Sequence, residues 1–352
     1  MPRRLTQLLS SLICSLLLSP VPAVAHVKWF LNRSEADILR DAKPELFTQL
    51  SLANILPVAC ALIALFLSTV AGREFCQWSV NKTLSLFADR MEPTINLFMG
   101  VCVGGSLIYC AMTRTLLAPN FIICAHCPWW LPYVECFAGC SLVLGLFARV
   151  GAAMLFGLLA FTFLKHSAAD CLDLVPLYGL AMYFLLVGRD CWSVDHLIGL
   201  DRRPDNNTVQ LAHLCVRVAA GVGLMILGLD EKLLHPQLAM ELLKHAPALN
   251  FASCVHLDNA MFVLCAGLTE LLLGLVVVVG SFPRTAMVFL AGFFVTTTLI
   301  FGVTELYGHL AYYAIIAAIL VRGAGSAAPV PVLKTAWSQV ASRLAQPAEQ
   351  PA

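Results

Sequence analysis

The sequence predicts an all-α integral membrane protein made of two tandem parallel four-helix transmembrane units and one extra N-terminal span. The first observation is composition: 59% of the 352 residues are hydrophobic and 12% are charged, whereas soluble domains average about 45–50% apolar and about 25% charged residues. The second is a series of apolar segments of about 20 residues, the length that crosses a bilayer. The third is a motif that occurs twice at one spacing. The net charge of +1 and the absence of a long Lys/Arg run give no indication of nucleic-acid binding.

Residues 1–25 are expected to be a secretory signal peptide. A basic start is followed by an apolar stretch and by a small-residue site, Ala23–Ala25, directly before His26. An uncleaved anchor helix is the alternative. Cleavage would leave His26 outside the cytoplasm, at the head of an extracytoplasmic amphipathic segment, 26–50.

The spans are expected to alternate across the membrane from this external N-terminus. The short loops that this places inside are basic and include Arg149 and Arg284, as the positive-inside rule requires. A multi-pass protein of the bacterial cytoplasmic (inner) membrane is therefore predicted, in contact with membrane lipid and with residues 324–352 as a cytoplasmic tail. The predicted spans are residues 51–72, 93–113, 129–148, 150–168, 171–188, 210–229, 258–280, 284–302 and 306–322.

An internal duplication organises the spans after the first. Glu135 and Glu270 each begin the pattern Glu-x3-Gly-x5-Gly-x3-Arg. "TLLAPN" echoes "KLLHPQ", and "YGLAMY" echoes "YGHLAYY", all in the same order. Residues 90–189 and 205–323 are therefore predicted to be two copies of one unit. Because each copy has an even number of spans, the two face the same way across the membrane.

The repeated glutamates are predicted to lie in the outer half of the bilayer. Each is about 21 Å along its helix from the arginine that ends the motif. An ionised carboxylate there costs at least about 2.5–3.5 kcal/mol unless it is paired. Arg114 is the expected partner of Glu135, and Lys232 or His309 that of Glu270. A structural ion pair, a proton-handling group and a snorkelling carboxylate remain open as interpretations.

Several of these features resemble the DoxX family, which includes the DoxD subunit of thiosulfate:quinone oxidoreductase. The resemblance rests on "RVAAGVGLMILGLDEKLL" from Arg217, on Glu270-x3-Gly274, on "FGVTELYGHLAYY" and, more loosely, on the first copy's motif from Glu135. It covers about residues 90–323. It implies a membrane subunit of redox traffic, working with a partner subunit or redox protein, that passes electrons from thiosulfate or a thiol to quinone.

Carried over to this chain, the resemblance makes five residues candidates for a polar pocket near a quinone or a small polar substrate: Glu270, Lys232, His309, Arg217 and, in the first copy, Glu135. Three other functions remain open. The first is a carrier, because the two copies are suited to carrying a small solute between them. The second is a scaffold for a membrane complex, which would use the glycine faces of the helices. The third is copper handling at the outer loops.

The outer loops contain Cys and His residues at short spacings. Cys124, His126 and Cys127 lie in the first copy, and Cys254 and His256 lie in the equivalent loop of the second. A disulfide is one interpretation in an oxidising compartment, and a redox couple is another. If the two loops converge, these five residues would form a site for a soft metal ion such as Cu(I) or Zn.

Overall fold

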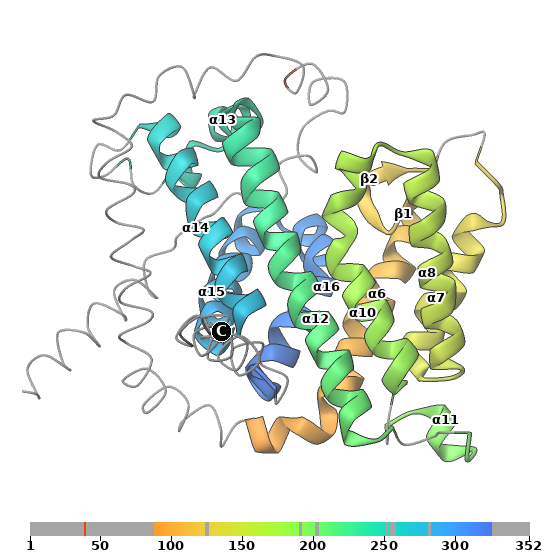
Figure 1. Cartoon of the computed structure of the whole chain (residues 1–352). Helices are drawn as coiled ribbons and strands as arrows, with labels where there is room; N and C mark the ends of the chain where they lie inside the picture. The colour runs from red at the N-terminus through yellow and green to blue at the C-terminus, as the bar shows by residue number, and fades with distance from the viewer. Residues whose placement is uncertain are drawn as a thin grey trace, which may run out of the picture.

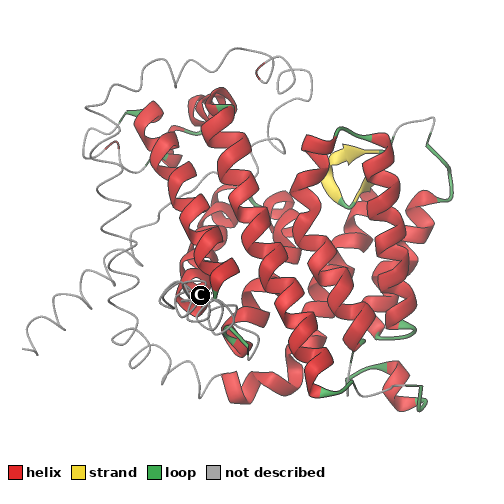
Figure 2. Ribbon diagram, viewed as in Figure 1, coloured by secondary structure: helices red, strands yellow, loops and turns green. Residues whose placement is uncertain are grey.

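The computed structural model describes residues 39, 88–123, 127–189, 192–200, 204–250, 253, 258–280 and 283–325. The predicted signal peptide (1–25), nearly all of the amphipathic segment, the first span (51–72) and almost the whole tail lie outside these residues. Within them the chain is helical except for one small β-hairpin (Figures 1 and 2). Four helical stretches are long and apolar enough to cross a membrane: Ala88–Thr113, Ala148–Lys165, Asn206–Leu234 and Asn259–Val279.

The first group of elements follows the first predicted repeat. Its hairpin, which the sequence did not predict, joins its first two long helices. The elements are η2 (Glu92–Thr94), α6 (Ile95–Thr113), β1 (Thr115–Leu116), β2 (Ala118–Ile122), α7 (Leu131–Leu144), α8 (Ala148–Lys165), α9 (Ala168–Cys171), η3 (Leu172–Leu174), α10 (Val175–Val187) and α11 (Val194–Leu197).

The second group has a short amphipathic helix, α13, in place of the hairpin. All eight predicted apolar segments after the first are helical in the described chain, at close to the predicted bounds. The elements are α12 (Asn206–Leu227), η4 (Gly228–Leu234, a π-helix), α13 (Pro236–His245), η5 (Pro247–Leu249), α14 (Asn259–Val279), α15 (Pro283–Phe301) and α16 (Val303–Arg322).

Local sequence signals set the ends of several helices. Asp205 caps α12 by accepting a hydrogen bond from the Thr208 N–H at 3.2 Å, and Asp258 caps α14 in the same way. At the other ends, Gly145 (φ 65°) and Gly280 (φ 76°) terminate α7 and α14 in the left-handed conformation that glycine adopts without a Cβ penalty. The helix that contains each repeated motif therefore ends in the same way, at the second glycine of the motif.

Glycines bring the first two long helices of each group into close contact. A Cβ on Gly139 would lie 2.7 Å from the carbonyl oxygen of Gly104, which brings α7 against α6. A Cβ on Gly274 would lie 2.5 Å from the carbonyl oxygen of Gly221, which brings α14 against α12. Only the absence of side chains at these positions permits such backbone approach.

Each group also packs its last long helix on the first long helix of the other group. α10 lies along α12, as Figure 1 shows, and α16 lies along α6. Tyr109 of α6 stacks on Tyr307 of α16 with ring centroids 4.1 Å apart. One continuous hydrophobic core therefore runs through both groups. We call the end that bears β1–β2 and α13 the hairpin end, and the opposite end, where α16 stops, the Arg322 end.

Candidate functional site

The candidate site lies where the π-helix η4 continues α12 toward the hairpin end. A Cβ on Gly228 would lie 2.7 Å from the carbonyl oxygen of Gly267, so η4 and α14 approach closely. The wider π-turn shifts the side chains that follow it relative to a regular α-helix, and such turns recur at functional sites. Here the segment contains two consecutive buried charged residues, Glu231 and Lys232.

Lys232 and Glu270 form an ion pair in this contact. The Lys232 ammonium donates to Glu270 Oε2 at 2.8 Å, and the two residues are 1% and 8% exposed. Of the two partners expected for Glu270, the structure therefore selects Lys232 and not His309. Breaking such a buried pair is costly, because the charge that remains is left without compensation.

Further carboxyl groups surround the pair. Glu231 is buried beside it, and Asp173 of η3 comes from the first group of helices. The Tyr312 hydroxyl of α16 lies within electrostatic reach of Asp173, Glu231 and Glu270. Because buried charge is strongly disfavoured, neighbouring buried carboxyl groups such as Glu231 and Glu270 favour the binding of a proton or another cation.

His309 lies in the same region but has a carboxylate partner of its own. Its Nδ1 is 3.2 Å from Oε1 of Glu305, one turn earlier on α16, and both residues are fully buried. The ring of Phe294 covers the imidazole at 4.3 Å between centroids, and the Tyr312 ring is 5.7 Å away. His309 is therefore a neighbour of Tyr312 on α16, and the ion pair that it forms is with Glu305.

Glu135 is held differently from Glu270. Its Oε1 accepts a hydrogen bond from the Leu117 N–H at 2.7 Å, and its Oε2 is buried with no hydrogen-bond partner among the described residues. Leu117 itself has φ 65°, in the left-handed region. The expected partner Arg114 is exposed and forms the C-cap of α6. The expected Arg114–Glu135 ion pair is therefore corrected to a hydrogen bond from the backbone of the hairpin.

Arg217 does not join the Lys232–Glu270 pair. It precedes Lys232 by about 20 Å along the helix axis, at the Arg322 end, where its guanidinium donates to the Ala324 carbonyl oxygen and lies against Gly280. The expected pocket containing Arg217 together with Glu270 is therefore divided between the two ends of the bundle.

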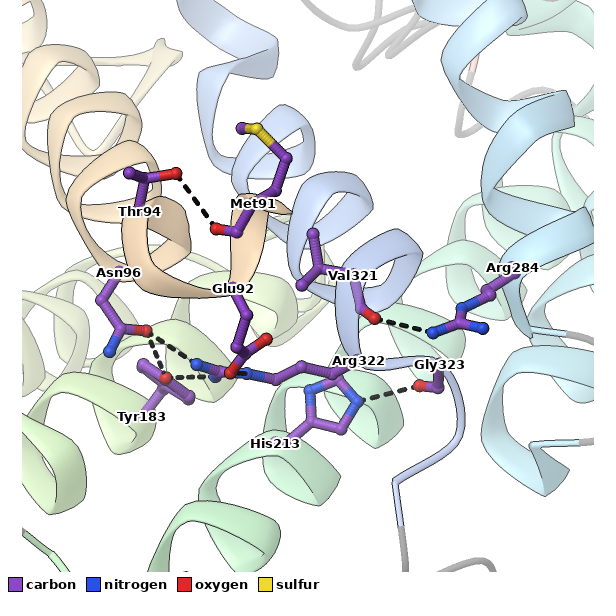
Figure 3. Close-up of polar contacts among 10 residues, drawn as sticks. All are labelled: Met91, Glu92, Thr94, Asn96, Tyr183, His213, Arg284, Val321, Arg322 and Gly323. Atoms are coloured by element: carbon purple, nitrogen blue, oxygen red, sulfur yellow. Dashed lines mark hydrogen bonds and ion pairs between the residues drawn. The ribbon is translucent and has the colours of Figure 1, made fainter. Parts of the chain in front are cut away.

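Arg217 belongs to a polar network at the Arg322 end, most of which is drawn in Figure 3. His213 donates to the Gly323 carbonyl oxygen at 2.9 Å, and Arg284 donates to the Val321 carbonyl oxygen at 2.7 Å. These bonds satisfy the last carbonyls of α16, where cations are also favoured by the helix dipole.

Arg322 connects this end of α16 to the first group of helices. It donates to Glu92 at 3.0 Å, to Asn96 at 3.1 Å and to the Tyr183 hydroxyl, which itself donates to Asn96 (Figure 3). We call Glu92, Asn96, Tyr183 and Arg322 the inner cluster. It joins α6, α10 and α16.

Arg189 satisfies backbone carbonyl groups at the end of α7, as Arg284 and His213 do at the end of α16. It follows α10 and donates to the carbonyl oxygens of Leu142 at 2.5 Å and Val143 at 2.8 Å. Burial lowers the pKa of Arg189 to about 10. A Cβ on Gly100 would collide with the Arg189 guanidinium, so the missing side chain at position 100 provides its space.

The predicted metal site falls mainly outside the described residues. Cys124, His126, Cys254 and His256 are not described, and Cys127 is half-buried. Within the described part of the chain, no group of three or more His, Cys, Asp or Glu residues is placed to hold a metal ion.

Four residues of the site region were not singled out from the sequence: Asp173, Glu231, Glu305 and Tyr312. Glu305 had a usable signal, since it precedes His309 by four residues and therefore shares its helix face. Glu231 adjoins Lys232 in the sequence. Asp173 and Tyr312 reach the site only through tertiary packing. Comparison with known proteins adds no relative: no protein-family model, curated protein or solved structure matches this chain.

Proposed function

We propose that the protein is a multi-pass subunit of the bacterial inner membrane that works in quinone-linked electron transfer, in the manner of the DoxX family. Its Lys232–Glu270 pair exchanges the protons of that reaction. The observation that carries the proposal is the buried pair with a further buried carboxyl group, that of Glu231, close to Glu270. Ionisable groups at such depth are characteristic of proton and substrate pathways.

The chemistry of a quinone matches these groups. Its reduction to a quinol takes up two electrons and two protons. Two thiosulfate ions joined by a new S–S bond, or two thiols oxidised to a disulfide, release the two electrons. The carboxyl groups around Glu270 supply protons, and Lys232 and Tyr312 are hydrogen-bond donors of the kind that the carbonyl oxygens of a quinone need.

We also infer that residues 90–189 and 205–323 are two copies of one unit, with the hairpin end facing outward. Matched glycine contacts support this: Gly139 meets Gly104 and Ile108 in the first group, and Gly274 meets Gly221 and Met225 in the second. The reciprocal packing of α10 on α12 and of α16 on α6 gives further support.

On this interpretation only the second copy keeps the ionic site. "TLLAPN" aligns with "KLLHPQ", so Thr115 stands in the first copy where the second has Lys232. Glu135 accepts its hydrogen bond from a backbone N–H and no ammonium faces it among the described residues. The first copy therefore has a structural role, and the second exchanges protons.

The test is thiosulfate-dependent reduction of a short-chain quinone by membranes that contain the protein. Glu270→Gln should abolish the reduction, because glutamine has no proton to exchange. Glu135→Gln is the matched control, since its amide oxygen can still accept the Leu117 hydrogen bond, and it should retain activity. Equal activity in both variants would refute the role of Glu270. No activity in the unchanged protein, shown to be inserted, would refute a stand-alone thiosulfate enzyme.

A small-solute carrier is the second candidate, favoured by the buried carboxyl groups of Glu231 and Glu270, which lie close to one another. Such a site would hold a cationic solute. Uptake of a monovalent or organic cation by reconstituted vesicles, without any redox donor, would support a carrier over an electron-transfer subunit.

A further inference from the structure

The segment between α10 and α12 connects the two groups of helices at the Arg322 end, where Figure 1 shows α11 on the opposite side of the molecule from the β-hairpin. We call its residues 192–200, which include α11, the connector loop. Large apolar side chains make up much of its exposed surface. They are Trp192 (59% exposed), Leu197 (82%), Ile198 (55%) and Leu200 (55%).

The polar groups of the connector loop face inward and hold it against the ends of α7 and α8. The Asp195 carboxylate accepts hydrogen bonds from the Phe147 N–H at 2.8 Å and the Ala148 N–H at 3.1 Å. The Asp195 N–H donates to the Gly145 carbonyl oxygen at 3.0 Å. Ser193 is buried and caps α11. The apolar side chains are therefore exposed by a loop whose backbone is held in place by hydrogen bonds.

This distribution is the reverse of the one expected for a loop in water. A water-facing loop turns its polar side chains to the solvent and its apolar ones inward. Here a buried serine and a bonded aspartate lie inside, and three of the four residues 197–200 expose a large apolar side chain. Exposed apolar patches of this kind mark a surface that contacts a membrane or another protein.

The position of the loop favours the membrane. Its hydrogen bonds from Asp195 attach it to the start of α8, which is long and apolar enough to cross a bilayer. Large apolar side chains are exposed around that attachment as well, on Leu144, Phe147 and Val150. The patch therefore continues the apolar surface that α7 and α8 present to lipid. Tryptophan is enriched where lipid meets water, since its ring is apolar and its N–H can still bond to water.

The charge of the segment indicates how it binds. Residues 189–205 contain three arginines and four aspartates, so the segment has no excess of positive charge. Attraction to anionic headgroups, which depends on clustered Lys and Arg, therefore does not account for binding. Insertion of apolar side chains at the level of the headgroups does.

We propose that the connector loop is an interfacial membrane anchor, in which Trp192, Leu197, Ile198 and Leu200 insert among the phospholipid headgroups at the Arg322 end. This role goes beyond electron transfer, since the loop lies at the other end of the bundle from the Lys232–Glu270 pair. Because Asp195 bonds to the first residues of α8, the anchor also fixes the depth at which that helix enters the bilayer.

Tryptophan fluorescence tests the anchor without any quinone or redox donor. Trp192 is retained as the only one of the six tryptophans, the others being replaced by phenylalanine, and the protein is reconstituted into phosphatidylcholine vesicles. Lipids brominated near the headgroup should quench Trp192 several-fold more than aqueous iodide does. Quenching by iodide and not by lipid would overturn the anchor, because Trp192 would then face water. Protection from both quenchers would also overturn it, because a second copy of the chain would then cover the loop.

Two substitutions at one position test the apolar patch. Leu197→Glu should relieve most of the lipid quenching and shift the Trp192 emission to longer wavelengths, whereas Leu197→Phe should keep both unchanged. Lipid quenching indifferent to Leu197→Glu would contradict insertion of the patch. Replacing part of the phosphatidylcholine by phosphatidylglycerol should leave the quenching unaltered, and quenching that requires the anionic lipid would overturn the apolar mode of binding. If Leu197→Glu does not insert into vesicles, the quenching of Trp192 in the parent protein still decides.

Discussion

Replacing Lys232 by methionine should destabilise the folded protein strongly, because it leaves Glu270 without its cation. The two residues are nearly inaccessible to solvent, and their charged atoms are 2.8 Å apart. Removing one partner of such a buried pair typically costs about 3–5 kcal/mol. Lys232→Met combined with Glu270→Leu should recover most of this loss, since neither charge then remains buried.

The chain contains a matched control for burial. Lys244 and Glu241 form an ion pair at 2.6 Å, but the Lys244 side chain is 66% exposed. Exposed pairs contribute about 0–1 kcal/mol, since water already solvates both charges. Lys244→Met should therefore have little effect, although the two pairs have nearly equal distances.

The free energy of unfolding is measured by titrating the purified protein in mixed micelles with a denaturing detergent. The cost of Lys232→Met should shrink as the pH falls, because Glu270 can then take up a proton and lose its charge. A cost of Lys232→Met no larger than that of Lys244→Met at neutral pH would contradict a buried ion pair. A double variant less stable than the single one would contradict it as well.

Three further predictions concern packing, capping and the inner cluster. Gly274→Ala places a methyl group against the α12 backbone and should cost about 1–3 kcal/mol, whereas Gly292→Ala, which faces open space, should be neutral or stabilising in the same unfolding titration. The hydrogen bonds from Thr208 lower the pKa of Asp205. The cap therefore stabilises the fold at pH values above the pKa of aspartate in the unfolded chain, and this contribution is lost as the pH falls through the lower pKa of Asp205 in the folded protein. The unfolding free energy of Asp205→Ala, measured against pH, should lack that dependence. Tyr183→Phe removes the hydroxyl shared within the inner cluster and should cost about 1–3 kcal/mol, and an unchanged unfolding midpoint would contradict that bond.

The helices were predictable from the sequence because apolar length and basic ends mark them directly. For Glu270 the sequence left two partners open, Lys232 and His309, and the structure shows the ion pair with Lys232. The Arg114–Glu135 pair was wrong because the hairpin supplies a backbone N–H from Leu117 in its place. No strand pattern in the sequence marks this hairpin, because its strands are very short and Pro119 interrupts the second one.

The remainder of the site depends on contacts between elements far apart in the chain. Asp173 approaches Tyr312 only because α10 and η3 of the first group pack against α12. The π-turn that begins at Gly228 has no sequence signature, yet it helps to place Glu231 and Lys232 against α14. Spacing along one helix can therefore predict pairs such as Glu305–His309, whereas convergence of several helices requires the packed structure.

The last helix links the two ends of the molecule. Toward the hairpin end α16 contributes Tyr312, whose hydroxyl lies within electrostatic reach of Glu270, and at its other end Arg322 joins it to α6 and α10. Because a helix is stiff along its axis, the inner cluster helps to fix how deeply Tyr312 is held among the carboxyl groups. Loosening the inner cluster should therefore slow proton exchange at Glu270 as well as lower stability, whereas loosening the Lys244 contact should do neither.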